Sequence, residues 1–335
     1  MLVRPRLLGL LFLACPLPAR AAPETLETRL QGLLAGARAR RAAASVVDVR
    51  TGRVLAQAGR NATGPDRSLC MRAWAPAASI FKIVTTAALL ESGVSPSQRV
   101  CYSGGLRRLM PRDLLDDPRR DLSCRTLSEA LSQSTNAVFA KLAKRHLDRA
   151  DLLRYAQAFG FRDRLYPDLE PSPADIPSDD FERARTAAGF FHVRLSPLHA
   201  ALIASVIARG GEMVLPTGKG AVRRVVREDT ARALGAMLLE TTTHGTARKA
   251  FHDRRGRPYL GKIRVAGKTG SLAERDPTFR DYSWFVGYAP ADKPAVAVGV
   301  IVENGPRWWT RGHFLARDVL QAYFKDKSSR VLAGR

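Results

Sequence analysis

Cysteine is scarce in this sequence, and the spacings that hold metals are missing. The 335 residues contain four cysteines, Cys15, Cys70, Cys101 and Cys124. Neither Cys-x-x-Cys nor His-Glu-x-x-His occurs, and these patterns are typical of structural and catalytic zinc sites. We therefore expect no metal and no cofactor.

Acidic residues are also few, at 31 Asp and Glu against 54 Lys and Arg, for a formal net charge of +23. Such an excess favours polyanions and anionic wall or membrane surfaces as partners. An arginine-rich amino-acid usage, visible in stretches such as RRAAA, explains the charge equally simply. No basic stretch is interleaved with aromatics in the manner of nucleic-acid-binding proteins, so we expect no nucleic-acid partner.

Long apolar runs are lacking as well. The N-terminal run at residues 7–15 follows two arginines and is too short to span a bilayer. Ala19-Arg20-Ala21 then offers a small-x-small cleavage site, so residues 1–21 are predicted to be a secretory signal peptide. An uncleaved anchor, or one lipidated at Cys15, is the less favoured alternative. The protein is expected to be exported to the periplasm or cell-wall space of a bacterium.

Export permits disulfides, which matters for the three cysteines after the predicted signal. Cys101 and Cys124 bracket a polar segment rich in arginine and aspartate. A bond between them would contribute roughly 3 kcal/mol by closing that loop. We favour this pair, with Cys70 free, while pairings that involve Cys70 stay open.

The order of the elements predicts the fold class. Residues 22–43 read as an N-terminal helix, and residues 44–59 as two strands joined by a turn. Residues 94–240 read as a helical block. Three strands, a helix to residue 325 and a tail at 326–335 follow. Strands from both ends of residues 44–325 therefore predict an α/β (α+β) domain, an antiparallel sheet flanked by helices with an inserted all-helical lobe.

The stretch VAGKTGSLAE at residues 265–274 contains a Gly-Lys-Thr triplet. A phosphate-binding loop needs a glycine five positions before Gly267, and Lys262 stands there, so that interpretation fails. On a strand, Lys268 and Thr269 would instead offer a positive charge and a donor to a carboxylate. Gly270 would let a ligand approach the backbone.

Two other stretches carry nucleophilic chemistry. Ser79 and Lys82 stand at i and i+3 at the start of an apolar helix, on one face. Burial lowers the pKa of a lysine, which can then accept the proton of a serine. Ser134 and Asn136 fall at a junction between two helical stretches. Each pattern taken alone is more often a helix cap or a turn.

Ser-x-x-Lys, Ser-x-Asn and Lys-Thr-Gly, in this order, resemble the penicillin-binding protein transpeptidase family of the serine β-lactamase fold. PAASIFK, HGTARKAF and WFVGYAP are similar to the family too, and the resemblance covers about residues 44–325. It implies a serine acyltransferase acting on D-Ala-D-Ala stem peptides of peptidoglycan, a D,D-transpeptidase or D,D-carboxypeptidase, with β-lactam antibiotics as inhibitors. We expect a transpeptidase-type domain without a further domain.

The resemblance also implies roles for eight residues. Ser79 would be the acylated nucleophile and Lys82 its general base, while Ser134 and Lys268 would carry a proton to the leaving amine. Asn136 would bind the substrate amide. Thr269, with Lys268, would hold the terminal carboxylate. The backbone N–H groups of Ser79 and Ser271 would form the oxyanion hole, and Gly270 would leave the backbone open to close approach.

Two alternatives remain. A serine β-lactamase shares the fold but needs a group that activates water. One class uses a Glu-x-x-Leu-Asn signature, which is absent around Glu170 and Glu182. Another uses a carboxylated lysine beside an apolar residue, where this chain has Asn136. The second alternative is a non-catalytic protein that binds peptidoglycan or β-lactams, which would have no need of Ser79 with Lys82.

Overall fold

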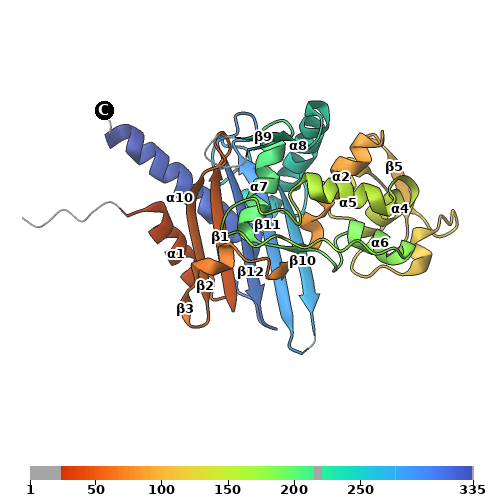
Figure 1. Ribbon diagram of the computed structural model, residues 1–335, viewed down its shortest axis with the longest axis horizontal. Coiled ribbons are helices and arrows are strands. Elements are labelled where there is room, and N and C mark those ends of the chain that lie inside the picture. Colours follow the sequence, from red (N-terminus) through yellow and green to blue (C-terminus); the bar gives the residue numbers. More distant parts are fainter. Residues whose placement is uncertain (1–23, 215–220, 276, 334–335) are drawn as a thin grey trace, which may run out of the picture.

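The computed structural model describes residues 24–214, 221–275 and 277–333 (Figure 1). The predicted signal peptide, residues 1–21, lies outside the described residues. Within them, no helix combines the length and the apolar character that a membrane crossing requires. No group of three or more His, Cys, Asp or Glu in this part of the chain could hold a metal ion.

A six-stranded antiparallel sheet forms the centre of the molecule, in the order β10-β11-β12-β1-β2-β3. Strands from the two ends of the sequence meet where β1 pairs with β12, with Ser45 opposite Gly299. This arrangement confirms the predicted fold class. The strands are β1 (Arg41–Asp48), β2 (Val54–Asn61), β3 (Gly64–Pro65), β10 (Ala266–Glu274), β11 (Arg280–Ala289) and β12 (Val296–Asn304).

Helices cover both faces of the sheet, which is why all nine residues of β12 are buried. Because side chains alternate along a strand, Val298 and Val300 face α1 (Leu26–Gly36) and α10 (Gly312–Ala333), while Ile301 faces α7 (Pro197–Ala208). Helix α7 lies so close that a Cβ at Gly299 would come within 2.1 Å of the Pro197 carbonyl oxygen.

The inserted lobe lies beside the β10 edge of the sheet (Figure 1). It differs from the prediction in three ways, the first being that it begins with α2 (Lys82–Glu91), before residue 94. A two-stranded ribbon lies among its helices, and it ends well before residue 240, because α7 packs on the sheet and α8 (Glu228–Thr243) packs against β10. The lobe consists of α2 (Lys82–Glu91), β5 (Arg99–Tyr102), β6 (Ser123–Thr126), α3 (Leu127–Ser132), α4 (Asn136–His146), α5 (Arg149–Ala158) and α6 (Asp180–Ala187).

Short elements complete the described chain. They are η1 (Arg67–Cys70), β4 (Ala75–Pro76), η2 (Ala78–Ile80), η3 (Pro111–Leu114), β7 (Arg194–Leu195), β8 (Glu212–Val214), β9 (Val222–Arg224) and α9 (Arg248–Phe251). Of these, η2 and α9 bear on the site described below.

Two predicted boundaries are wrong. The N-terminal helix predicted at residues 22–43 ends at Gly36, and residues 41–43 already belong to β1, where pairing with β12 outweighs the helix propensity of alanine. The tail predicted at 326–335 continues α10 as far as Ala333, since no glycine or proline interrupts residues 326–333.

The disulfide prediction agrees with the structure. Cys101 on β5 and Cys124 on β6 are directly opposite in the ribbon and form a disulfide. Cys70 is free and buried, and its Sγ donates to the carbonyl oxygens of Ala44 and Ala58. Burial raises the pKa of the Cys70 thiol to about 12, so this side chain stays protonated and unreactive.

Candidate active site

Ser79 lies in the short 3-10 turn η2, directly before α2, and not within the helix itself. Ala78 holds a positive φ of 49°, which bends the chain sharply before the serine. Buried Ile80 and Phe81 fix the turn to the core. Ser79 Oγ and Lys82 Nζ are 2.9 Å apart, so the predicted i, i+3 pair is in contact.

The Lys82 amine is wholly buried and has three neighbours. Besides Ser79, it donates to Asn136 Oδ1 at 2.6 Å and to the Ala188 carbonyl oxygen. Burial, and then the charge of Lys268, lower the pKa of Lys82 well below its ordinary value of 10.5. A neutral amine has two N–H groups and one lone pair. The two oxygen acceptors use both N–H groups, which leaves the lone pair for the Ser79 hydroxyl.

Ser134 lies at the junction between α3 and α4 with a positive φ of 58°. Lys268 on β10 donates to Ser134 Oγ at 2.9 Å and to the Thr269 carbonyl oxygen at 2.8 Å. Burial lowers the pKa of Lys268 to about 7. Lobe and sheet therefore meet at a lysine that can hold or release a proton near neutral pH.

The rest of the Lys-Thr-Gly stretch lies along β10, the edge strand of the sheet, which packs against η2. A Cβ at Gly270 would come within 3.1 Å of the Ile80 side chain, next to Ser79, so a side chain there would press on the turn that carries Ser79. Thr269 Oγ1 lies 2.5 Å from Thr246 Oγ1. Ser271, at the exposed end, continues the strand.

Thr246 was not predicted as a site residue, although it belongs to the HGTARKAF stretch. Its backbone N–H donates to the Ser132 carbonyl oxygen at 3.0 Å, beside Ser134. A Cβ at Gly245 would come within 2.3 Å of that same oxygen, so glycine lets the turn approach α3. The turn before α9 thus connects the Ser-x-Asn junction with Thr269.

Asn136 is held from two sides. Its Oδ1 accepts from Lys82, and its Nδ2 donates to the Leu106 carbonyl oxygen at 2.6 Å. Leu106 belongs to the loop between β5 and β6, at residues 103–122, whose ends the Cys101–Cys124 disulfide joins. This contact fixes the orientation of the amide so that its oxygen faces Lys82.

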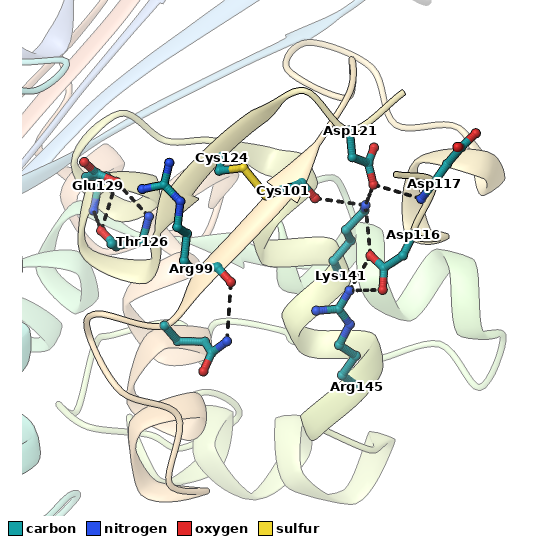
Figure 2. The surroundings of a disulfide bond; sticks show 11 residues. Arg99, Cys101, Asp116, Asp117, Asp121, Cys124, Thr126, Glu129, Lys141 and Arg145 are labelled. Carbon is teal, nitrogen blue, oxygen red and sulfur yellow. Dashed lines mark hydrogen bonds and ion pairs between the residues drawn. A yellow bond between two sulfur atoms is a disulfide. The ribbon is translucent and has the colours of Figure 1, made fainter. Parts of the chain in front are cut away.

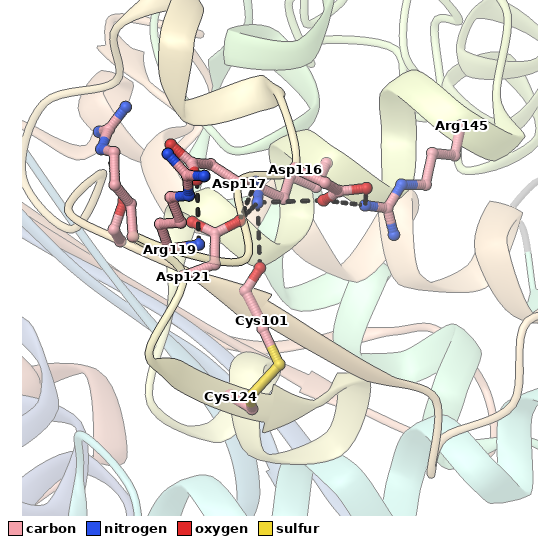
Figure 3. A network of polar contacts seen from close by, with 10 residues as sticks. Cys101, Asp116, Asp117, Arg119, Asp121, Cys124 and Arg145 are labelled. Atoms are coloured by element: carbon pink, nitrogen blue, oxygen red, sulfur yellow. Dashed lines mark hydrogen bonds and ion pairs between the residues drawn. A yellow bond between two sulfur atoms is a disulfide. The ribbon is translucent and has the colours of Figure 1, made fainter.

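A buried lysine anchors that loop to α4 (Figure 2). Lys141 Nζ donates to the Cys101 carbonyl oxygen at 3.0 Å and pairs with Asp116 and Asp121. In Figure 3, Arg145 extends toward Asp116, and the disulfide lies beside the carboxylates. Burial of Asp121 raises its pKa, but the hydrogen bond and charge of Lys141, together with hydrogen bonds from the Asp117 backbone and Ser103, outweigh this effect and the net pKa is lowered. Lys141 and Leu106 were not predicted to support the site.

Gly189 is a further position that the sequence did not reveal. It has a φ of +88°, and a Cβ there would lie 2.5 Å from the Ala78 carbonyl oxygen and 2.9 Å from Ser79 Cα. A glycine directly after a helix is a signal for a helix end, so the sequence could have marked α6's terminus. Its closeness to Ser79 could be found only from the fold.

Residues 42–321 match the family model described as the penicillin binding protein transpeptidase domain. The chain belongs to this family. Peptidoglycan D,D-transpeptidase PbpA of Mycobacterium tuberculosis is 28% identical over 265 residues, which are 74% of this chain and 53% of that protein. Stage V sporulation protein D of Bacillus subtilis is 28% identical over 253 residues, 68% of this chain and 38% of that protein. The chain thus spans about half the length, or less, of these relatives.

Solved structures show the same fold. The ceftriaxone acyl-enzyme complex of M. tuberculosis penicillin-binding protein A has a TM-score of 0.72 at 22% identity, covering 90% of this chain and 78% of that one. The transpeptidase domain of Burkholderia pseudomallei penicillin-binding protein 3 also has a TM-score of 0.72, at 20% identity, covering 91% and 93%. At these identities the likeness establishes the fold.

Proposed function

We propose that this chain is a penicillin-binding serine acyltransferase that acts on D-Ala-D-Ala stem peptides of peptidoglycan through an acyl-enzyme on Ser79. The observation that carries the proposal is the buried Lys82 amine, 2.9 Å from Ser79 Oγ, with both of its neutral-state N–H groups directed to oxygen acceptors. Relatives named peptidoglycan D,D-transpeptidases support the substrate class.

Acylation begins with the Ser79 hydroxyl. Lys82 takes its proton while Ser79 Oγ bonds to the carbonyl carbon of the penultimate D-alanine. The carbonyl oxygen becomes an oxyanion, which the backbone N–H groups of Ser79 and Ser271 stabilise. When the C–N bond breaks, Ser134 passes a proton to the leaving nitrogen and recovers one from Lys268, and the terminal D-alanine departs. The ester on Ser79 remains.

Substrate placement uses the edge strand and the lobe. The terminal carboxylate is held by Thr269 and by the positive charge of Lys268, with Thr246 bonded to Thr269 Oγ1. The Asn136 amide bonds the substrate's peptide group through its second Nδ2 hydrogen, since the first goes to Leu106. Gly270 leaves room for the substrate backbone beside β10.

The ester is released by an amine in transpeptidation or by water in carboxypeptidation. A β-lactamase would need a group that activates water, and the two glutamates weighed for this role are engaged elsewhere. Glu170 accepts from the Ala73 backbone N–H at 3.0 Å. Glu182 pairs with Arg185 and His192. Slow loss of a β-lactam acyl group is therefore expected, with such antibiotics as inhibitors.

The setting is proposed to be the periplasm or cell-wall space, reached after removal of residues 1–21. Peptidoglycan lies outside the cytoplasm, and the three cysteines that remain there include the disulfide pair, which is consistent with an oxidising compartment.

Intact-mass spectrometry after mixing with a penicillin tests the proposal, with Ser79→Ala as the control. We expect one lasting adduct of the antibiotic's mass on the wild type and none on the variant. Antibiotic hydrolysis without a lasting adduct would establish the β-lactamase alternative instead. Absence of both in a folded sample would favour the non-catalytic binding protein.

A second assay shows whether an amine or water is the preferred acceptor of the acyl group. A D-Ala-D-Ala stem peptide is incubated with and without an amine acceptor, and products are separated by mass. A cross-linked product in the presence of the amine identifies a transpeptidase. Release of D-alanine without any cross-linked product, even in the presence of the amine, identifies a carboxypeptidase.

A further inference from the structure

Three segments far apart in the sequence meet at one end of the sheet. They are residues 38–40, Arg275 with residues 277–280, and residues 305–311. Asp281 at the start of β11 lies opposite Asn304 at the end of β12, which brings the last two segments together. Together they form a group of basic and aromatic side chains that we name the arginine–tryptophan patch. Its members are Arg38, Arg40, Arg275, Phe279, Arg280, Arg307, Trp308, Trp309 and Arg311.

Contacts between and within the segments hold the patch together. Arg40 Nη1 donates to the Phe279 carbonyl oxygen at 3.3 Å. The Arg38 guanidinium lies 5.6 Å from the ring centre of Trp309, and that of Arg311 lies 4.5 Å from Trp308. These are cation–π distances, so the arginines and the rings form one surface.

The loop that carries the two tryptophans is fixed at both ends. Asn304 Nδ2 donates to the Thr310 carbonyl oxygen at 3.1 Å, and the Gly312 backbone N–H donates to Ser283 Oγ at 3.0 Å. Trp308 and Trp309 are nevertheless 50% and 65% exposed. The other two tryptophans of the chain, Trp74 and Trp284, are buried. Two adjacent exposed tryptophans on a fixed loop indicate a surface that meets a partner.

The positive charge of the patch indicates the sign of the charge on its partner. The patch contains six arginines and no acidic member, and the sequence adds one aspartate, Asp276, next to Arg275. The described acidic groups nearby are Glu274, Asp281 and Glu303. Glu274 and Asp281 are partly buried, Glu274 accepts from Tyr282, and the buried Glu303 pairs with Arg41. The arginines still outnumber these acids. A partner that complements the patch must therefore be anionic.

We propose that the arginine–tryptophan patch docks the protein on the surface of an anionic lipid bilayer. Tryptophan rings are favoured at the level of lipid headgroups, where one side is apolar and the other is wet. Each arginine near an anionic bilayer adds to the electrostatic attraction. A guanidinium lies over one face of each tryptophan ring, which leaves less of the ring for stacking on a sugar. The docking does not depend on the reaction proposed for Ser79.

Tryptophan fluorescence is a direct test, because Trp308 and Trp309 are the two exposed tryptophans among four. The predicted mature chain, from residue 22, is mixed with vesicles of phosphatidylglycerol and phosphatidylcholine, or of phosphatidylcholine alone. We expect a blue shift, and quenching by brominated lipid, with the anionic vesicles and neither with the neutral ones. The effect should weaken as salt is raised.

Matched variants locate the binding surface. Trp308→Ser/Trp309→Ser should reduce sedimentation with anionic vesicles at least tenfold. Arg254→Ala/Arg255→Ala removes two exposed arginines from the loop after α9, near the opposite end of β10, and should bind like the wild type. Acylation by a penicillin, retained by both variants, shows that they are folded, and Ser79→Ala should bind vesicles normally.

Three results would overturn the proposal. In the first, the wild type does not sediment with anionic vesicles. In the second, the double tryptophan variant and the double arginine variant lose binding equally, which would indicate a general effect of charge. Binding to purified peptidoglycan sacculi in place of vesicles, lost in the tryptophan variant, would assign the patch to glycan. If acylation fails while patch-dependent binding persists, the proposed reaction is wrong and the docking stands.

Discussion

Lys268 Nζ lies 2.9 Å from Ser134 Oγ, joining two residues that are 134 positions apart in the sequence. One belongs to the edge strand of the sheet and the other to a junction between two helices of the lobe. The proposed proton path to the leaving group therefore exists only when the two parts are folded against each other. The pKa of Lys268, lowered to about 7 by burial, makes that contact sensitive to pH.

The rate of acylation should follow a bell-shaped pH profile. It should rise with pH as Lys82 loses its proton, and fall above about pH 7 as Lys268 loses the charge that holds the substrate carboxylate. Lys268→Arg keeps a positive charge at every accessible pH, so its alkaline limb should disappear even if the rate is lower. Stopped-flow acylation by a penicillin between pH 5.5 and 10 measures both profiles. An unchanged alkaline limb in the variant would assign that limb to another group.

Stability should rise with pH because of the same buried lysines. A lysine whose pKa is lower in the folded state binds fewer protons there than in the unfolded chain. The free energy of unfolding therefore increases from the folded pKa up to 10.5, by about 1.4 kcal/mol per pH unit for each lysine. Lys268→Met, which removes the lysine with a folded pKa of about 7, should show a flatter slope between pH 7 and 9 in urea unfolding. Lys249→Met removes an exposed lysine and should keep the wild-type slope.

Gly189→Ala should damage the nucleophile's turn. The new Cβ would lie 2.5 Å from the Ala78 carbonyl oxygen, so the turn that carries Ser79 must move, and acylation should slow at least tenfold. Gly93→Ala is the matched control, because Gly93 has a similar φ of +91° but no atom within 4 Å of the added Cβ. Both variants should lose about 1–2 kcal/mol of stability through backbone strain. Equal acylation rates would show that the contact at Gly189 is unimportant for the reaction.

Lys141→Met should loosen the loop that holds Asn136. The change leaves Asp121 and the Cys101 carbonyl oxygen without their buried donor, at a cost of about 3–5 kcal/mol. Penicillin acylation should slow while the disulfide stays intact, as measured by thiol titration. Arg145→Met removes only the exposed partner of Asp116 and should acylate normally. If Lys141→Met acylated at the wild-type rate, the loop would not position Asn136.

The contacts of Ser79, Lys82 and Lys268 were partly predictable because the patterns that carry these residues are local. Ser79 and Lys82 share one face by their spacing alone, and Lys268 lies on a strand that the apolar pattern predicts. Gly189, Lys141 and the Leu106 carbonyl oxygen were missed because their roles depend on contacts between distant segments. No local pattern records such contacts, and a backbone carbonyl has no side-chain signature at all.

The same limit explains the error in the extent of the lobe. Helix α7 is buried on every side, and an all-apolar pattern does not say whether a helix packs on a sheet or on other helices. The start of β1 was missed for a related reason, since an alanine-rich stretch favours a helix until a neighbouring strand pairs with it. In both places the local sequence has a real helix preference or apolar pattern. Packing against the sheet then determines where the segment lies and which structure it adopts.

Strand β10 carries Lys268 near one end and leads to Arg275 just beyond the other. Seven residues of extended chain span about 23 Å. The strand is therefore a spacer as well as a wall of the site, because it separates Lys268 from the patch proposed to meet a bilayer. Lengthening both arms of the β10–β11 hairpin by two residues would carry Arg275 and Phe279 about 7 Å away from Trp308 and Trp309, which lie on another loop, and would split the patch. The lengths of the hairpin and of the tryptophan loop must therefore match for the patch to meet a flat surface.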